Sequence, residues 1–179
     1  MLSLVIGGAR SGKSRFAQSL AASFEKVAYI ATCRPEDAEM AERIAQHRRD
    51  RPPHWLTIEA PLEIAGAVER NAPHYELLVL DCLTIWLSNF SYEWRESPPA
   101  ELRSAALNEV SRAIAAAGET HLVIVTNEVG CGLVPESPVG RLFRDLHGWV
   151  NQETARSADW VYHLVAGIAV AIKRPEGAR

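Results

Sequence analysis

Residues Gly7 to Ser14, with the sequence GGARSGKS, have the composition and spacing of a phosphate-binding P-loop. Glycines in such a loop let backbone N–H groups curl around phosphate oxygens, and the positive end of the following helix points at the same anion. Lys13 is then expected to contact the β- and γ-phosphates, and Ser14 to ligate Mg²⁺. We therefore predict that the chain binds a nucleoside triphosphate and Mg²⁺ through Gly7, Gly8, Ala9, Arg10, Ser11, Gly12, Lys13 and Ser14.

Two acidic residues follow apolar runs and could take part in the same chemistry. Asp81 ends a buried run, where a carboxylate commonly holds the Mg²⁺ shell of a P-loop enzyme. Asp81 could instead cap the helix that follows it. Glu128 could act as a base or position a water, or it could anchor its loop to Arg141 or Arg144.

The segment MAERIAQHRRDRP, residues 40–52, is the second informative feature. Its helical spacing places His47 beside the buried stripe of a helix, and Arg48, Arg49 and Arg51 surround the ring with positive charge. These cations disfavour an imidazolium and attract a triphosphate, and a neutral imidazole can attack phosphorus. The alternative is a solvent-facing histidine at a charged helix end. We interpret the other five histidines as structural.

The elements that must position these residues alternate along the chain. Apolar runs predict buried strands at residues 2–6, 27–31, 76–81 and 121–126, with a short strand at 55–58. Helices are predicted between them at residues 13–24, 35–49, 62–69, 83–90, 100–117 and 139–157. Residues 160–165 and 168–173 read as a hairpin, and 91–99 and 127–138 as loops. This alternation predicts an α/β fold with a mostly parallel sheet flanked by helices, an antiparallel C-terminal hairpin, and a site at the carboxyl ends of the strands.

Length and composition narrow the function classes. The chain has 179 residues, which predicts one domain over residues 1–179. Its net charge of −3 gives no case for nucleic-acid binding, and no apolar run is long enough for a membrane span. The three cysteines are scattered and suit a reducing compartment, so we expect a cytoplasmic protein.

Several segments together resemble a known family. They are GGARSGKS at 7–14, YIAT at 29–32, DAEMAERIAQHRRDRPPHW at 37–55, LDCLT at 80–84, TNEVGCGLVPE at 126–136 and GRLFRDLHGWVNQ at 140–152. In this order they resemble the bifunctional adenosylcobinamide kinase / adenosylcobinamide-phosphate guanylyltransferase of cobalamin biosynthesis. The resemblance covers nearly the whole chain, and the segments around His47 and Glu128 are far more specific than the P-loop.

The resemblance implies two reactions and a site for each. ATP or GTP would phosphorylate adenosylcobinamide, and GMP would then pass from GTP to that phosphate through a His47–GMP intermediate. The nucleotide would be surrounded by the P-loop and by Ala31, Thr32, Cys33, Arg48, Arg49, Asp50, Arg51, Glu59 and Asp81. Relatives can carry Glu at the position of Asp81. The family also implies a RecA-like P-loop fold and a homo-oligomer, typically a trimer. The alternative is a simple P-loop kinase for another small molecule, without guanylyl transfer.

Overall fold

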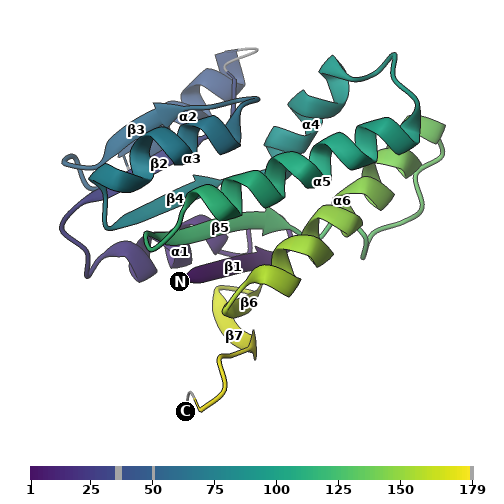
Figure 1. Ribbon diagram of the computed structural model, residues 1–179. Coiled ribbons are helices and arrows are strands. Elements are labelled where there is room, and N and C mark those ends of the chain that lie inside the picture. The colour runs from purple at the N-terminus through teal and green to yellow at the C-terminus, as the bar shows by residue number, and fades with distance from the viewer. Residues whose placement is uncertain (35–37, 50, 178–179) are drawn as a thin grey trace.

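The computed structural model describes residues 1–34, 38–49 and 51–177. Within these residues one seven-stranded sheet forms the centre of the molecule, in the order β3-β2-β4-β5-β1-β6-β7 (Figure 1). Neighbouring strands run parallel except β7, which is antiparallel to β6. The strands are β1 Leu2–Gly7, β2 Val27–Ala31, β3 Leu56–Glu59, β4 Leu77–Asp81, β5 His121–Asn127, β6 Trp160–Val165 and β7 Ile168–Lys173. The predicted mostly parallel sheet with an antiparallel hairpin is therefore confirmed.

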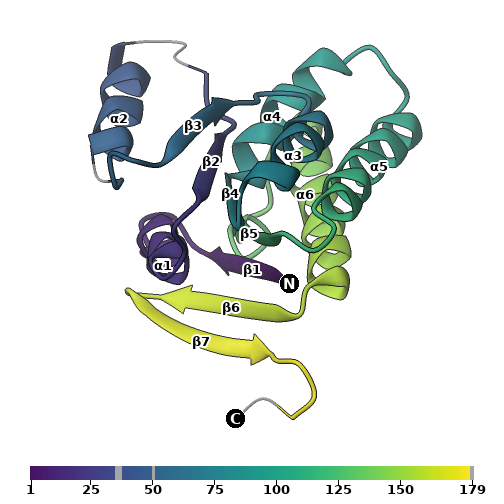
Figure 2. The ribbon, with the colours of Figure 1, turned by 60° about the vertical axis from the view of Figure 1, so that its left-hand side comes forward.

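Helices cover both faces of the sheet, as Figures 1 and 2 show. The central strands are apolar on both sides, and successive residues point to opposite faces. Leu78 and Leu80 of β4 thus join the core under α3, α4, α5 and α6, whereas Leu77 and Val79 join the core under α1. The helices are α1 Lys13–Ala21, α2 Ala38–Arg49, α3 Ile64–Asn71, α4 Leu83–Glu93, α5 Pro99–Ala116 and α6 Pro138–Ser157, with a 3-10 turn η1 at Ala72–His74.

Many element boundaries differ from the predicted ones, by one to three residues. Helix α1 ends at Ala21, three residues before its predicted end, and α3 begins at Ile64 rather than at residue 62. Residues 91–99 were predicted as a loop, but α4 continues to Glu93. The continuation has a packing reason, because the Phe90 and Trp94 rings stack with centroids 5.6 Å apart and the Trp94 N–H donates to the Phe90 carbonyl. The predicted first turn of α2 at residue 35 lies outside the described residues.

The C-terminal hairpin turns through two residues with positive φ. Ala166 has φ 51° and Gly167 has φ 85°. A two-residue loop with both residues in the left-handed region matches the twist of the strands that it joins. The hairpin predicted from Ala166 and Gly167 is confirmed, and its tip lies beside the loop that follows β1, where the Gly167 N–H donates to the Ser11 carbonyl at 3.0 Å.

Candidate active site

The P-loop connects β1 to α1 and bends through two left-handed residues. Arg10 has φ 56°, and Gly12, at the N-cap of α1, has φ 94°. The Lys13 ammonium folds back over the loop and donates to the Gly8 carbonyl at 2.6 Å. Burial lowers the pKa of Lys13, while the nearby Cys82 and Asp81 groups oppose that shift. The loop is therefore a cationic cradle that faces the carboxylate at the end of β4.

The C-terminal hairpin supports the P-loop from outside. A Cβ on Gly7 would stand 2.4 Å from the Leu164 carbonyl oxygen of β6, so no side chain fits there. A Cβ on Gly12 would stand 3.4 Å from the Cα of Gly167. The glycines thus serve close backbone packing, in addition to the phosphate binding that the sequence predicts for them. The Ser11 hydroxyl is buried without a hydrogen-bond partner in the described chain, as suits a loop built for an anion.

Asp81 is oriented by a tyrosine that sequence reasoning had not singled out. The Tyr29 hydroxyl donates to Asp81 Oδ2 at 2.6 Å, and the other carboxylate oxygen accepts no hydrogen bond within the described residues. Burial, followed by the charge of Asp81, raises the pKa of Tyr29 well above its usual value, so the phenol remains a donor. The N-cap of α4 is Cys82, with no side-chain cap hydrogen bond, so the alternative of Asp81 as the helix cap is wrong.

The ends of three neighbouring strands bring further predicted residues to the same rim. Ala31 of β2 lies level with Glu59 of β3 and with Asp81 of β4, and the Glu59 side chain is exposed. Beyond β2, the buried Thr32 hydroxyl donates to the Cys82 carbonyl and accepts from the Cys82 N–H, both at 2.9 Å. The peptide bond between Asp81 and Cys82 is cis. These contacts join the segments after β2 and β4, and Cys33 follows directly.

His47 and its arginines lie at the far edge of this rim. Figure 2 shows α2 outside the β3 edge of the sheet, apart from α1. The His47 ring is half-buried and forms no hydrogen bond with any described residue. Arg48 is exposed, and Arg49 donates to Glu42 at 2.6 Å. Arg51 instead turns inward and is buried, and the predicted nucleotide contact at position 50 lies outside the described residues.

The alternative that Glu128 anchors its loop to Arg141 or Arg144 is wrong. Glu128 Oε1 accepts the Gly130 N–H of its own loop at 3.0 Å. Arg141 donates to two backbone carbonyls of that loop, and Arg144 pairs with the adjacent Asp145 at 3.1 Å. Arginines near a helix start satisfy local carbonyls at less entropic cost than a distant carboxylate would require. The role of Glu128 as a base stays a prediction, and its N–H donates to the Gly7 carbonyl at 3.1 Å.

A buried polar network lies behind the rim and was missed from the sequence. The Nε2 atom of His147 is 3.0 Å from the Thr84 hydroxyl and 3.3 Å from that of Thr126. Asn151 Nδ2 lies 3.2 Å from His147 Nδ1 and also donates to the Asn127 carbonyl at 3.0 Å. Because an amide nitrogen only donates, Nδ1 accepts and the neutral ring carries its proton on Nε2. Burial lowers the pKa of His147 to about 4.

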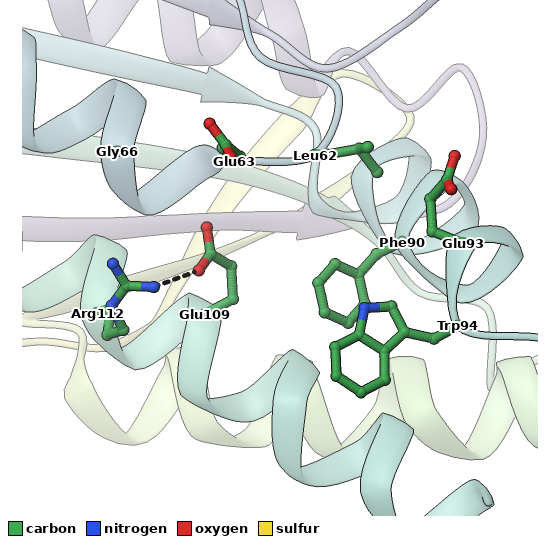
Figure 3. A pocket seen from close by; sticks show the side chains of 8 residues that line it. All are labelled: Leu62, Glu63, Gly66, Phe90, Glu93, Trp94, Glu109 and Arg112. Carbon is green, nitrogen blue, oxygen red and sulfur yellow. Dashed lines mark hydrogen bonds and ion pairs between the residues drawn. The ribbon is translucent and has the colours of Figure 1, made fainter. Parts of the chain in front are cut away.

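A pocket of about 320 Å³ lies between α3, α4 and α5. Figure 3 shows the Phe90 and Trp94 rings on one side and the Glu109–Arg112 pair on the other. An ion pair of 3.8 Å between Arg34 and Glu93 joins this side of the molecule to the segment after β2. The pocket borders the rim but shares no residue with the P-loop. Its lining is Leu62, Glu63, Gly66, Phe90, Glu93, Trp94, Glu109 and Arg112.

Comparison with known proteins gives a family match over nearly the whole chain. The family described as "Cobinamide kinase / cobinamide phosphate guanyltransferase" matches residues 3–172. Proteins from Escherichia coli and Salmonella typhimurium, both described as "Bifunctional adenosylcobalamin biosynthesis protein CobU", are 41% and 40% identical over 97% of this chain and 100% of their own. The corresponding CobP protein of Pseudomonas aeruginosa is 40% identical over 97% of this chain and 98% of its own.

The fold also matches a solved structure of a distant protein. An ATPase from the type III secretion system of pathogenic bacteria superposes with a TM-score of 0.58 at 9% identity. The match covers 95% of this chain and 56% of the ATPase. At this identity the likeness concerns the fold alone, and it agrees with the predicted P-loop α/β architecture. No helix in the described part of the chain is long and apolar enough to cross a membrane.

Proposed function

This chain belongs to the cobinamide kinase / cobinamide phosphate guanyltransferase family, and we propose how its residues carry out the two reactions. It is a bifunctional kinase and guanylyltransferase of cobalamin biosynthesis. In the first reaction, ATP or GTP phosphorylates the terminal hydroxyl of the aminopropanol arm of adenosylcobinamide. In the second, GMP passes from GTP to that phosphate, giving adenosyl-GDP-cobinamide and pyrophosphate.

The kinase step is assigned to the P-loop and Asp81. Backbone N–H groups of residues 7–14 bind the phosphates, and Lys13 moves from the Gly8 carbonyl to the β- and γ-oxygens. The Ser14 hydroxyl and the Asp81 carboxylate suit Mg²⁺, which takes few protein oxygens and neutralises phosphate charge. The observation that carries this assignment is geometric: the P-loop follows β1 and Asp81 ends β4 at the same edge of the sheet, with only β5 between these two strands. The Asp81 carboxylate is also close enough to oppose the lowering of the Lys13 pKa by burial.

The guanylyl transfer is assigned to His47. A nitrogen lone pair of its neutral ring forms a bond to the α-phosphorus of GTP, and the bond from that phosphorus to the bridging oxygen breaks to release pyrophosphate. A phosphate oxygen of adenosylcobinamide phosphate then attacks the same phosphorus, and the N–P bond breaks to restore the ring. Ala31, Thr32, Cys33, Arg48, Arg49, Asp50 and Glu59 complete the proposed nucleotide site. Arg51 is not assigned to the nucleotide, because its buried guanidinium donates to the His47 carbonyl and the Thr57 hydroxyl.

A labelling experiment tests this assignment. GTP labelled in its α-phosphate is expected to leave acid-labile label on the wild-type protein and none on His47→Ala. The matched control is His74→Ala, which removes an exposed histidine at the opposite end of the strands and should label normally. A wild-type enzyme that forms adenosyl-GDP-cobinamide but never carries label would rule out the covalent step. Transfer of only the terminal phosphate, with no guanylyl product, would favour the simple kinase.

The assembly and location follow as further proposals. We propose that residues 1–179 act as one domain within a homotrimer, and that the enzyme works in the cytoplasm. One continuous sheet supports the single domain, and an apolar edge at the C-terminal hairpin supports association. The three cysteines, all in the described part of the chain, form no disulfide, as a reducing compartment requires.

A further inference from the structure

A single tyrosine connects the two halves of the proposed site. Tyr29 lies in the middle of β2 with its side chain almost fully buried. Its hydroxyl donates to Asp81 Oδ2 at 2.6 Å, which fixes one oxygen of the carboxylate. Side chains that hydrogen-bond to a metal-binding carboxylate hold it in one orientation and raise the affinity for the metal.

One face of the same ring carries Arg51, which lies two residues beyond the end of α2. The Arg51 guanidinium carbon lies 3.8 Å from the centroid of the Tyr29 ring. Its Nε donates to the His47 carbonyl at 2.8 Å, and its Nη1 donates to the Thr57 hydroxyl of β3 at 3.1 Å. Arg51 therefore ties the backbone of His47 to β2 and β3 at once.

The planar guanidinium suits this place in a way that an ammonium would not. It stacks on an aromatic ring while donating in its own plane to two acceptors, and a lysine cannot reproduce that arrangement. Burial lowers the pKa of Arg51, whereas Tyr29 and Asp81 oppose this shift. These two neighbours therefore favour the charged form of the guanidinium. Two of the donor nitrogens are committed to protein acceptors, which makes Arg51 a structural cation more than a phosphate ligand.

We propose that Tyr29 and Arg51 form a clamp that holds the Asp81 carboxylate and the His47 segment in a fixed relation. The inference rests on the proposed roles of Asp81 and His47, and it makes both clamp residues positioning residues. Tyr29 acts on the metal side, which serves both reactions. Arg51 acts on the His47 side, which serves only guanylyl transfer. The two halves of the clamp therefore have different consequences when each is removed.

Tyr29→Phe tests the metal side, because it removes the hydroxyl and keeps the ring under Arg51. We expect the affinity of the GTP-bound protein for Mn²⁺, measured by the EPR signal of the free ion, to fall about tenfold. Labelling at saturating metal should stay near that of the wild type. The control is Tyr92→Phe, since Tyr92 also carries an arginine, Arg95, at 4.4 Å from its ring centroid but lies on α4. Unchanged Mn²⁺ affinity in Tyr29→Phe would overturn the metal half of the proposal.

Arg51→Lys tests the His47 side. We expect the single-turnover rate of labelling from α-labelled GTP to fall at least about tenfold, whereas phosphorylation of adenosylcobinamide and Mn²⁺ affinity remain near wild type. Thr57→Val removes one acceptor of Arg51 and should slow labelling in the same direction, which keeps the test open if Arg51→Lys does not fold. Arg95→Lys is the control, because Arg95 also stacks on a tyrosine and donates to a backbone carbonyl, that of Tyr92 at 2.7 Å.

The outcomes separate the clamp from the function on which it rests. If Arg51→Lys and Thr57→Val slow both reactions equally, or neither, the His47 half of the clamp is wrong. If the wild type turns over without ever carrying label, the covalent role of His47 fails and the Arg51 half fails with it. The Mn²⁺ titration of Tyr29→Phe still decides the other half, because it does not depend on His47.

Discussion

One imidazole ring, that of His147, contacts three polar side chains behind the candidate site, those of Thr84, Thr126 and Asn151. His147 is buried, donates from Nε2 to Thr84 at the start of α4, and accepts at Nδ1 from Asn151, which also binds the Asn127 carbonyl. The Asn127 N–H in turn donates to the Thr84 hydroxyl at 2.9 Å. Protonation of Nδ1 would place two donors face to face, so the network requires the neutral ring.

This requirement predicts a specific loss of stability in acid. The pKa of His147 is lowered from 6.5 to about 4 in the folded protein, so the unfolded chain takes up the proton first as the pH falls. The stabilisation is complete above pH 6.5 and is lost between pH 6.5 and 4. Between pH 7 and pH 5 the wild type should lose about 2 kcal/mol of unfolding free energy that His147→Gln does not lose.

Denaturant titrations at the two pH values measure this difference. His74→Gln is the control, because that ring is exposed and its removal should leave the pH dependence of the wild type unchanged. If the wild type and His147→Gln lose the same unfolding free energy between pH 7 and pH 5, the neutral His147 ring does not contribute to the pH dependence of stability, and the prediction is wrong.

Individual residues differ in how well the sequence reveals them. Lys13 and Asp81 were predictable, since a motif marks the first and the end of an apolar run marks the second, and the structure places both at the same edge of the sheet. Tyr29 and His147 were not identified as site residues. Each lies inside an apolar pattern, where an aromatic ring is expected to be a core residue. The Asp81 partner of Tyr29 is 52 residues away, and the two threonines that contact His147 are 63 and 21 residues away. Such contacts depend on strand order and register, which local patterns do not encode.

At the scale of elements, the contact between the P-loop and the C-terminal hairpin makes a prediction about Gly7. A Cβ there would meet the Leu164 carbonyl at 2.4 Å, and both β1 and β6 are fixed by the ladder that joins them. Gly7→Ala should therefore destabilise the protein by about 1–3 kcal/mol, through displaced backbone. Gly8→Ala is the matched control for stability, because a Cβ at Gly8 has no atom within 4 Å. Equal unfolding midpoints for the two variants in a denaturant titration would contradict this account.

The elements themselves were largely predictable from the sequence. Buried strands such as β4 and β5 are continuous apolar runs, and their bounds differ from the predicted ones by one residue. The end of α4 was missed because the packing of Phe90 against Trp94, which extends the helix past residue 90, has no local signature. The support of the P-loop by the hairpin was missed for a related reason. It requires β6 to lie next to β1, and the sequence does not give strand order.

At the scale of the whole molecule, the sheet ends in an apolar edge. Ile168, Val170 and Ile172 alternate with alanines along β7, so they share one face, and they are 68%, 52% and 62% exposed. Exposed apolar side chains on an edge strand favour contact with another chain.

The mass of the protein in solution tests whether the β7 edge forms the contact between subunits of the proposed trimer. If β7 is the contact between subunits, the double substitution Ile168→Lys and Val170→Lys places two charges in the interface, and light scattering should show the trimer mass of the wild type replaced by that of the monomer. The control is Tyr92→Lys, which adds a charge at a side chain that is 65% exposed on α4, on another side of the molecule. A wild type that is itself monomeric at micromolar concentration would contradict the proposed trimer. A doubly substituted protein that keeps the trimer mass would show that the interface does not lie at β7.

The tip of this hairpin contacts Ser11 of the P-loop. A monomeric variant should therefore also be assayed for nucleotide binding, which would report whether association stabilises the loop.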